Sequence, residues 1–249
     1  MYTYAITNLK GGTGKTTSAV NLAYSLAMTG KRVLVVDADP QANLTPFFAR
    51  ANRHGKTLLD VLKEPQKAEG CIYRSKYLNI DIIRGNTALR ESDVQSEWQL
   101  ARALAAIQKD YDYCIIDTRP AFENLTMSAV YAADLLLTPA CLDKFCRDNL
   151  ALVDEFLDSI PEEYRPEWLV YATKVDPNRK AQRSIYTDIL EKHAYPFLTT
   201  CISRSAVVDN ALNLYKPVGK HRPKSQVSQD YMELVAELME REDAAHGEI

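Results

Sequence analysis

A glycine-rich loop stands between the first apolar run of the chain and its first helical stretch. Residues 2–7 read YTYAIT, Lys10 to Thr17 read KGGTGKTT, and apolar residues recur at helical spacing over 15–29. Glycines let the backbone curl so that successive N–H groups point at phosphate oxygens, and the positive N-terminal end of the following helix strengthens that attraction. A strand, a glycine loop and a helix in this order predict an α/β fold with a phosphate site.

The residues of this loop have separate predicted roles. Lys15 is placed to reach the β- and γ-phosphates of a nucleotide, and the hydroxyl of Thr16 is placed to ligate Mg²⁺. The predicted nucleotide-binding residues of the loop are Gly11, Gly12, Thr13, Gly14, Lys15, Thr16 and Thr17. A glycine turn without a ligand is the alternative, and the position between strand and helix argues against it.

The rest of the chain continues the alternation of apolar runs and helical stretches. The further apolar runs are 32–38, 78–83, 111–117, 133–139, 167–173 and 197–202, and the further helical stretches are 87–109, 145–158, 180–193 and 226–242. Several runs are apolar on successive residues, as strands buried on both faces are. We expect a mostly parallel, twisted sheet flanked by helices on both faces, with ligands at the carboxyl ends of its strands. Pro, Gly and charged residues mark 50–57 and 216–225 as loops.

Length and composition fit one globular domain. The 249 residues are 46% apolar and 25% charged, so we expect a single domain over 1–249, with a flexible acidic tail at 241–249. No apolar stretch approaches the ~18 residues that span a bilayer. Five cysteines without CxxC spacing favour reduced thiols over a metal cluster or disulfides. These features favour a cytoplasmic protein without a membrane partner.

Carboxylates lie at the ends of two predicted strands. Asp37 and Asp39 come at the carboxyl end of one apolar run, and Asp117 ends another. Buried carboxylates beside a phosphate loop are costly unless a cation such as Mg²⁺ or a positioned water offsets their charge. The alternative for Asp37 or Asp39 is a helix N-cap.

The loop resembles the deviant Walker A motif of the ParA/MinD family of ATPases, which also includes relatives of the nitrogenase iron protein and arsenite-pump ATPases. KGGTGKTT has the extra leading lysine of that motif, Lys10, and Asn8 stands where the general phosphate-loop pattern has its first glycine. VLVVDADPQANLT (33–45) is similar to the family's D-x-D-P-Q-G-N-x-T stretch, with Ala42 in place of glycine. The likeness covers nearly the whole chain and is greatest to partition ATPases without an N-terminal helix-turn-helix domain.

A second stretch, YDYCIIDTRPAFENLT (111–126), is similar to the family's Walker B strand and the helix after it. Arg119 replaces the first of two prolines usual there, which predicts a less rigid turn. The resemblance implies that Asp117 holds Mg²⁺ through water, that Asp37 supports the water shell of the metal, and that Asp39 orients or activates the attacking water.

The resemblance also implies catalytic roles for three residues, Lys10, Lys15 and Asp39. Lys10 would reach across a nucleotide-sandwich dimer to the phosphates of the partner subunit, and a solvated lysine at a strand end is the alternative. Thr173 and Asp176 would lie on the adenine side of the site. Thr173 to Asp176 also resembles the N-K-x-D box of GTPases, but Thr173 lacks the carboxamide of that motif, so ATP is favoured over GTP.

The function implied is a slow, partner-stimulated ATPase that dimerises on ATP, binds DNA non-specifically and segregates plasmid, chromosome or mobile-element DNA with a ParB-like centromere-binding protein. The net charge of −3 requires a local basic patch for such binding. The predicted DNA-binding residues are Lys216, Lys220, Arg222 and Lys224, and an ordinary solvated surface is the alternative. Such a protein would associate with the nucleoid.

Two other functions share the ATPase core. A MinD-like membrane-associated positioning ATPase is the main alternative, and the acidic C-terminus argues against it. An electron-transfer ATPase like the nitrogenase iron protein needs paired cysteines at the dimer axis, and the cysteine spacing here does not supply them.

Overall fold

The computed structural model describes residues 1–49 and 55–247 and contains a seven-stranded sheet with the order β3-β4-β2-β5-β1-β6-β7. The strands are β1 (Tyr2–Ile6), β2 (Val33–Asp37), β3 (Ile72–Arg74), β4 (Ile80–Ile83), β5 (Tyr113–Asp117), β6 (Leu135–Cys141) and β7 (Glu167–Thr173). All neighbouring strands run parallel except β3, which is antiparallel to β4. The predicted fold class is therefore confirmed.

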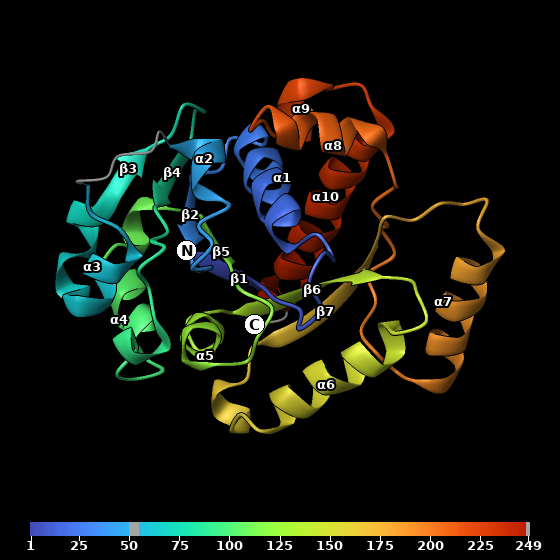
Figure 1. Ribbon diagram of the computed structural model, residues 1–249, viewed down its shortest axis with the longest axis horizontal. Coiled ribbons are helices and arrows are strands. Elements are labelled where there is room, and N and C mark those ends of the chain that lie inside the picture. Colours follow the sequence, from blue (N-terminus) through green and yellow to red (C-terminus); the bar gives the residue numbers. More distant parts are fainter. Residues whose placement is uncertain (50–54, 248–249) are drawn as a thin grey trace.

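Helices cover both faces of the sheet (Figure 1). They are α1 (Lys15–Met28), α2 (Thr45–Phe48), α3 (Leu58–Lys63), α4 (Gln99–Ala105), α5 (Asn124–Val130), α6 (Cys146–Asp158), α7 (Lys180–Lys192), α8 (Ala206–Asn213), α9 (Val218–His221) and α10 (Gln226–Gly247). Alternate residues of β2 show the layering, because Val33 and Val35 pack with the α1 and α10 side while Leu34 and Val36 pack with α3 and α4. Continuous apolar runs are thus explained by burial on two faces.

The helix predicted over 87–109 is much shorter in the structure. Only α4 is α-helical, and short 3₁₀ turns lie at Glu91–Asp93 and Gln108–Asp110. Polar side chains before α4 form hydrogen bonds to the backbone that stabilise turns and not a helix. For example, the carboxylate of Asp93 accepts from the backbone N–H of Arg90 (2.8 Å). This local competition is typical of Asp and Ser.

The strand predicted over 197–202 is also wrong. Phe197 makes an isolated bridge to Val170, and the N–H groups of Leu198 and Ile202 donate to the carbonyls of Val170 (2.7 Å) and Ala172 (2.8 Å), but the run forms no continuous strand. Glu237 of α10 accepts hydrogen bonds from the backbone N–H groups of Thr199 and Thr200 (2.8 Å each), so these donors are used by a side chain rather than by a strand.

The end of the chain differs from the predicted tail. Helix α10 continues to Gly247, so residues 241–247 are helical. Glu242 accepts hydrogen bonds from the hydroxyls of Tyr113 (2.7 Å) and Tyr4, which fixes this part of α10 against the sheet. Within the predicted loop 216–225 lies the short helix α9, and residues 50–54 of the predicted loop 50–57 fall outside the described residues.

Two properties of the described residues bear on the class of protein. All five cysteines are free thiols. No helix within residues 1–49 and 55–247 has both the length and the apolar character needed to cross a bilayer.

Candidate nucleotide site

The glycine loop connects β1 to α1 at the carboxyl edge of the sheet. Gly12 and Gly14 have φ angles of 75° and 104°, a left-handed backbone that side chains with a Cβ rarely adopt. The carbonyl of Gly14 already accepts a hydrogen bond from the N–H of Ser18 (2.7 Å), so α1 begins directly at the loop. The two glycines therefore allow the tight curl that leads into α1, and the cradle of N–H groups around a phosphate stays a prediction.

Lys15 lies inside this loop. Its Nζ donates to the carbonyls of Asn8 (2.9 Å) and Lys10 (3.2 Å), and only 7% of the residue is exposed. Burial lowers the pKa of the Lys15 ammonium, while the charges of Asp117 and Asp39 oppose that shift. The structure thus brings Lys15 and both acidic loops to one place, as the sequence predicted.

Asp37 and Asp117 end neighbouring strands and face each other in register. Both are fully buried. One oxygen of Asp37 accepts hydrogen bonds from the N–H (2.8 Å) and hydroxyl (2.6 Å) of Thr45, the first residue of α2, although the N-cap of that helix is Leu44 and not Asp37. Gly85 is needed beside this carboxylate, because a Cβ there would stand 2.7 Å from the carboxyl carbon of Asp37.

The remaining oxygens of this pair fit a hard cation. The other oxygen of Asp37 and both oxygens of Asp117 have no hydrogen-bond partner among the described residues. Burial raises the pKa of Asp37 to about 6, and burial together with the charge of Asp37 raises that of Asp117 well above its ordinary value, although the nearby Thr16 hydroxyl opposes the second rise. Buried oxygen donors without partners, next to a loop hydroxyl, suit Mg²⁺.

A change from Asp37 to Asn should stabilise the nucleotide-free, Mg²⁺-free protein at pH 8, by on the order of 1–3 kcal/mol. The unfolded chain ionises Asp37 near pH 4 and the folded protein near pH 6, so wild-type stability falls as pH rises through this window. The gain should shrink below pH 6 and vanish near pH 4. Urea denaturation in EDTA across this range measures it. An exposed control on α6, Asp154→Asn, should show no such pH dependence, and a pH-independent gain for Asp37→Asn would contradict the assignment.

Asp39 lies just beyond β2 and is partly exposed. Its Oδ1 accepts a hydrogen bond from the backbone N–H of Gln41 (2.8 Å), which forms a tight turn. Ala42 in the same loop has a φ of 51°, the left-handed conformation that explains the glycine usual at this position. The carboxylate keeps one oxygen for other partners, as the predicted contact with an attacking water requires.

Lys10 differs from Lys15 in where its charge lies. The Nζ of Lys10 forms an ion pair with Asp143, and the two side chains are 30% and 44% exposed. The ammonium also lies over the ring of Phe145, 5.4 Å from its centroid. Lys10 is therefore held at the rim of the loop, toward the start of α6.

Two residues that support the loop were not predicted. Asn8 donates to the carbonyl of Pro139 (2.9 Å) and its Oδ1 accepts from the N–H of Lys10 (2.8 Å) and from Asn149 (2.6 Å). Lys174, at a φ of 54°, donates from Nζ to the carbonyl of Gly12 (2.7 Å). The departure from glycine at Asn8 was the sequence signal for the first, and only the fold brings Lys174 to the loop.

Of the two residues predicted on the adenine side, Thr173 ends β7 and Asp176 follows it. The hydroxyl of Thr173 donates to the carbonyl of Thr13 (2.9 Å), so this buried residue holds the glycine loop against the end of β7. The carboxylate of Asp176 accepts from the N–H of Asn178 (3.0 Å) and pairs with Arg179 (3.6 Å). Their contacts with a base stay predictions.

Arg119 does not leave the Walker B turn loose. Its guanidinium pairs with Glu91 (2.7 Å) and Glu123 (3.1 Å), and the second oxygen of Glu91 accepts from the N–H of Leu125 (3.0 Å). These ion pairs connect the turn to α5 and to the 3₁₀ turn at Glu91–Asp93. The loss of rigidity expected from the missing proline is therefore offset by the ion pairs of Arg119 with Glu91 and Glu123.

The predicted DNA-binding residues lie away from the loop. Lys216, Lys220, Arg222 and Lys224 are on α9 or beside it. Helix α9 packs against α1, where the N–H of Val218 donates to the side chain of Asn21 (2.7 Å).

The chain is similar to known proteins over most of its length. A family model described as an AAA domain matches residues 1–168. A virulence plasmid ParA family protein of Chlamydia psittaci is 30% identical over 246 residues, which cover 96% of this chain and 94% of that protein. The sporulation initiation inhibitor protein Soj of Bacillus subtilis is 28% identical over 244 residues, which cover 94% and 96%.

Solved structures share the fold. A Cyanothece McdA–ATP complex has a TM-score of 0.83 at 24% identity and covers 96% of each chain. Cobyrinic acid a,c-diamide synthase of Mycobacterium smegmatis, with an ATP analogue and magnesium, has a TM-score of 0.83 at 22% identity and covers 98% of this chain and 97% of that one. The chain belongs to the ParA/MinD family of P-loop ATPases, whose cofactors are ATP and Mg²⁺.

Proposed function

We propose that this protein is an ATP-driven dimerisation switch that binds DNA non-specifically and segregates a DNA cargo with a ParB-like centromere-binding partner. The position of Lys10 carries the proposal. The other lysine of the motif, Lys15, is buried among loop carbonyls, whereas Lys10 is held at the exposed rim by Asp143. A cation at the rim can exchange that carboxylate for the phosphates of a second subunit.

Different residues would bind the phosphates, orient the attacking water and stabilise the charge that develops during hydrolysis. The loop N–H groups, Lys15 and Thr16 hold the phosphates, and Asp39 orients the attacking water. Thr16, and through water Asp37 and Asp117, would hold Mg²⁺, which would supply positive charge to neutralise the phosphates. Lys10 adds a second cation where negative charge develops, the role that an arginine finger has in other phosphoryl-transfer enzymes.

Turnover without a partner would be slow. Lys10 has to leave Asp143, and two subunits have to meet, before the full set of charges surrounds the phosphates. A DNA cargo is favoured because one relative is named as a plasmid ParA family protein. A protein that works on such a cargo would be cytoplasmic and nucleoid-associated.

Lys10→Ala should bind Mg-ATP with near wild-type affinity and stay monomeric. The substitution removes the cation that crosses to the partner but leaves the contacts of Lys15 in place. Light scattering with ATP present measures the mass. Lys144→Ala is a matched control, because Lys144 also lies over the Phe145 ring, 4.6 Å from its centroid, and should dimerise normally. If the Lys10 variant dimerises normally, Lys10 does not act across the dimer and is a solvated lysine at a strand end.

A further inference from the structure

A basic hollow of about 660 Å³ lies at the C-terminal end of α1, and we call it the Lys76 hollow. Three separate segments line it, namely the end of α1, the loop 75–79 between β3 and β4, and the chain around α9. Its main lining residues are Tyr24, Met28, Lys76, Tyr77, Lys216 and Lys220. Among the described residues that line the hollow, three are lysines and none is Asp or Glu.

The lysines gather without a lining carboxylate to balance them. The Nζ of Lys76 donates to the carbonyl of Tyr215 (3.1 Å), which brings the loop 75–79 beside the chain that precedes α9. Partial burial, and then the charge of Lys216, lowers the pKa of Lys76. Like charges held together raise the free energy of the folded chain, and an anion between them would relieve this cost.

Two tyrosines add neutral hydroxyls to the lining. The rings of Tyr24 and Tyr77 meet edge to face with centroids 5.5 Å apart. Burial raises the pKa of both hydroxyls, that of Tyr77 to about 12, so they stay protonated at neutral pH. Protonated hydroxyls can donate to phosphate oxygens, as tyrosines do in contacts with nucleic-acid backbones.

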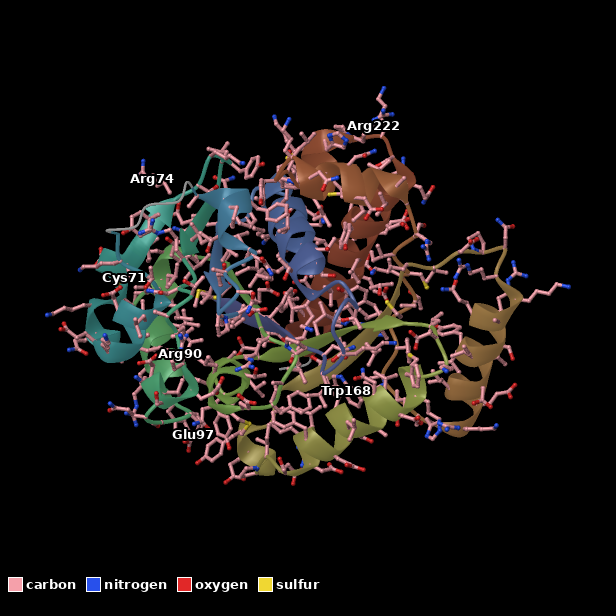
Figure 2. All side chains as sticks on the ribbon, viewed as in Figure 1. Cys71, Arg74, Arg90, Glu97, Trp168 and Arg222 are labelled. Carbon is pink, nitrogen blue, oxygen red and sulfur yellow. The ribbon has the colours of Figure 1, made fainter. Side chains whose placement is uncertain are left out.

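The hollow is distinct from the nucleotide site. The phosphate loop leads into α1 at Lys15, whereas the first α1 residue that lines the hollow is Tyr24, so nine residues of the helix, about 14 Å, separate them. Two more cationic residues border segments that line the hollow, Arg222 directly after α9 and Arg74 at the end of β3. Figure 2 shows these two arginines on the upper side of the molecule.

We propose that the Lys76 hollow seats a backbone phosphate of DNA. The inference rests on the proposed non-specific DNA binding and extends the binding surface to the loop 75–79, about 140 positions from Lys216 in the sequence. A polyanion is favoured because the described lining gathers three lysines from two separate segments and no Asp or Glu, while the net charge of the whole chain is −3. Contacts of this kind require no reading of bases.

Lys76→Gln is the test, because glutamine keeps an N–H donor for the Tyr215 carbonyl and removes the charge. DNA affinity is measured with ATP on random-sequence duplex across a salt series. We expect affinity to fall on the order of tenfold at 0.1 M salt, with a log–log salt slope shallower by about 1 for each subunit bound. Lys76→Arg should restore most of the affinity. Lys63→Gln, which removes an exposed lysine on α3, should change neither quantity.

The outcomes separate the two proposals. ATP binding, ATP-dependent dimerisation and the thermal midpoint should be those of wild type in Lys76→Gln. If wild type binds DNA and this variant has the same affinity and slope, the inference is overturned and the proposed function stands. Absence of DNA binding by ATP-bound, dimeric wild type overturns both. Leu78 and Met28 are 85% and 62% exposed nearby, so sedimentation with phosphatidylglycerol vesicles is included. Lys76-dependent vesicle binding without DNA binding would assign the hollow to a lipid surface instead.

Discussion

Replacement of Asp39 by alanine should lower ATP turnover by ~10²-fold or more while ATP affinity stays near that of wild type. The expected split follows from geometry. We assign the phosphate contacts to the loop and Lys15, whereas Asp39 stands outside the loop, on the turn after β2, where one of its oxygens accepts from the N–H of Gln41. Removing a group that positions water raises the barrier to hydrolysis and leaves the ground-state contacts intact.

Asp39→Asn is the matched variant for this prediction. Asparagine keeps a carbonyl oxygen for the N–H of Gln41, so the turn is retained while the negative charge is lost. Both variants should lose turnover to a similar extent if the charge is what matters. Recovery of activity in the asparagine variant would show that the turn, not the carboxylate, supports catalysis.

The ATP state of these variants should accumulate as a dimer. This ATP-bound dimer carries one basic surface from each subunit, so it should bind random-sequence DNA more strongly than wild type does during ATP turnover. The affinity should fall steeply as the salt concentration rises. Gel shifts with ATP and with ADP over a salt series measure this. Equal or absent DNA binding in both nucleotide states, for a variant shown to be dimeric, would remove DNA from the proposed function and leave the ATPase switch.

The central part of the fold could be predicted because each strand there is buried on both faces. Continuous apolar runs such as 32–38 therefore marked β2, and glycines at left-handed positions marked the loop. The edge strand β3 has three residues, none of them fully buried, so its sequence carries little pattern. The run 197–202 has a strand-like composition, but the carboxylate of Glu237 takes the N–H groups that a ladder would need.

The candidate site likewise contains residues that the sequence predicted and residues that only the fold brings to it. Residues close in sequence to a recognisable motif, such as Lys15 and Asp117, were predicted and come together in the structure. Lys174 and Gly85 act on the site through tertiary contacts, with the carbonyl of Gly12 and with Asp37 respectively. Lys76 and Lys216 lie far apart along the chain and become neighbours only because β3 and α9 flank the same end of α1. No local pattern predicts such pairs.

Replacement of Lys15 by alanine should abolish measurable ATP binding, a loss of ~10²-fold or more in affinity. Charge-assisted hydrogen bonds contribute about 1.5–3 kcal/mol each, and Lys15 is placed to make them to two phosphates. In the structure the same Nζ donates to the carbonyls of Asn8 and Lys10. Its loss removes one donor from each of these acceptors, and the Lys10 carbonyl keeps the hydroxyl of Thr13 as a donor (3.4 Å), so we expect the cost in stability to be modest.

Calorimetric titration with Mg-ATP, together with a thermal melt, separates the two effects of this substitution. The Lys15 variant should melt cooperatively within a few degrees of wild type and give no binding heat. Lys109→Ala removes the same charge from an exposed position outside the site and should bind ATP normally, which excludes a general effect of net charge. Unchanged ATP affinity in folded Lys15→Ala would mean that the glycine loop between β1 and α1 is not where the phosphates bind, and the roles assigned to Thr16, Asp37 and Asp117 around it would fall with it.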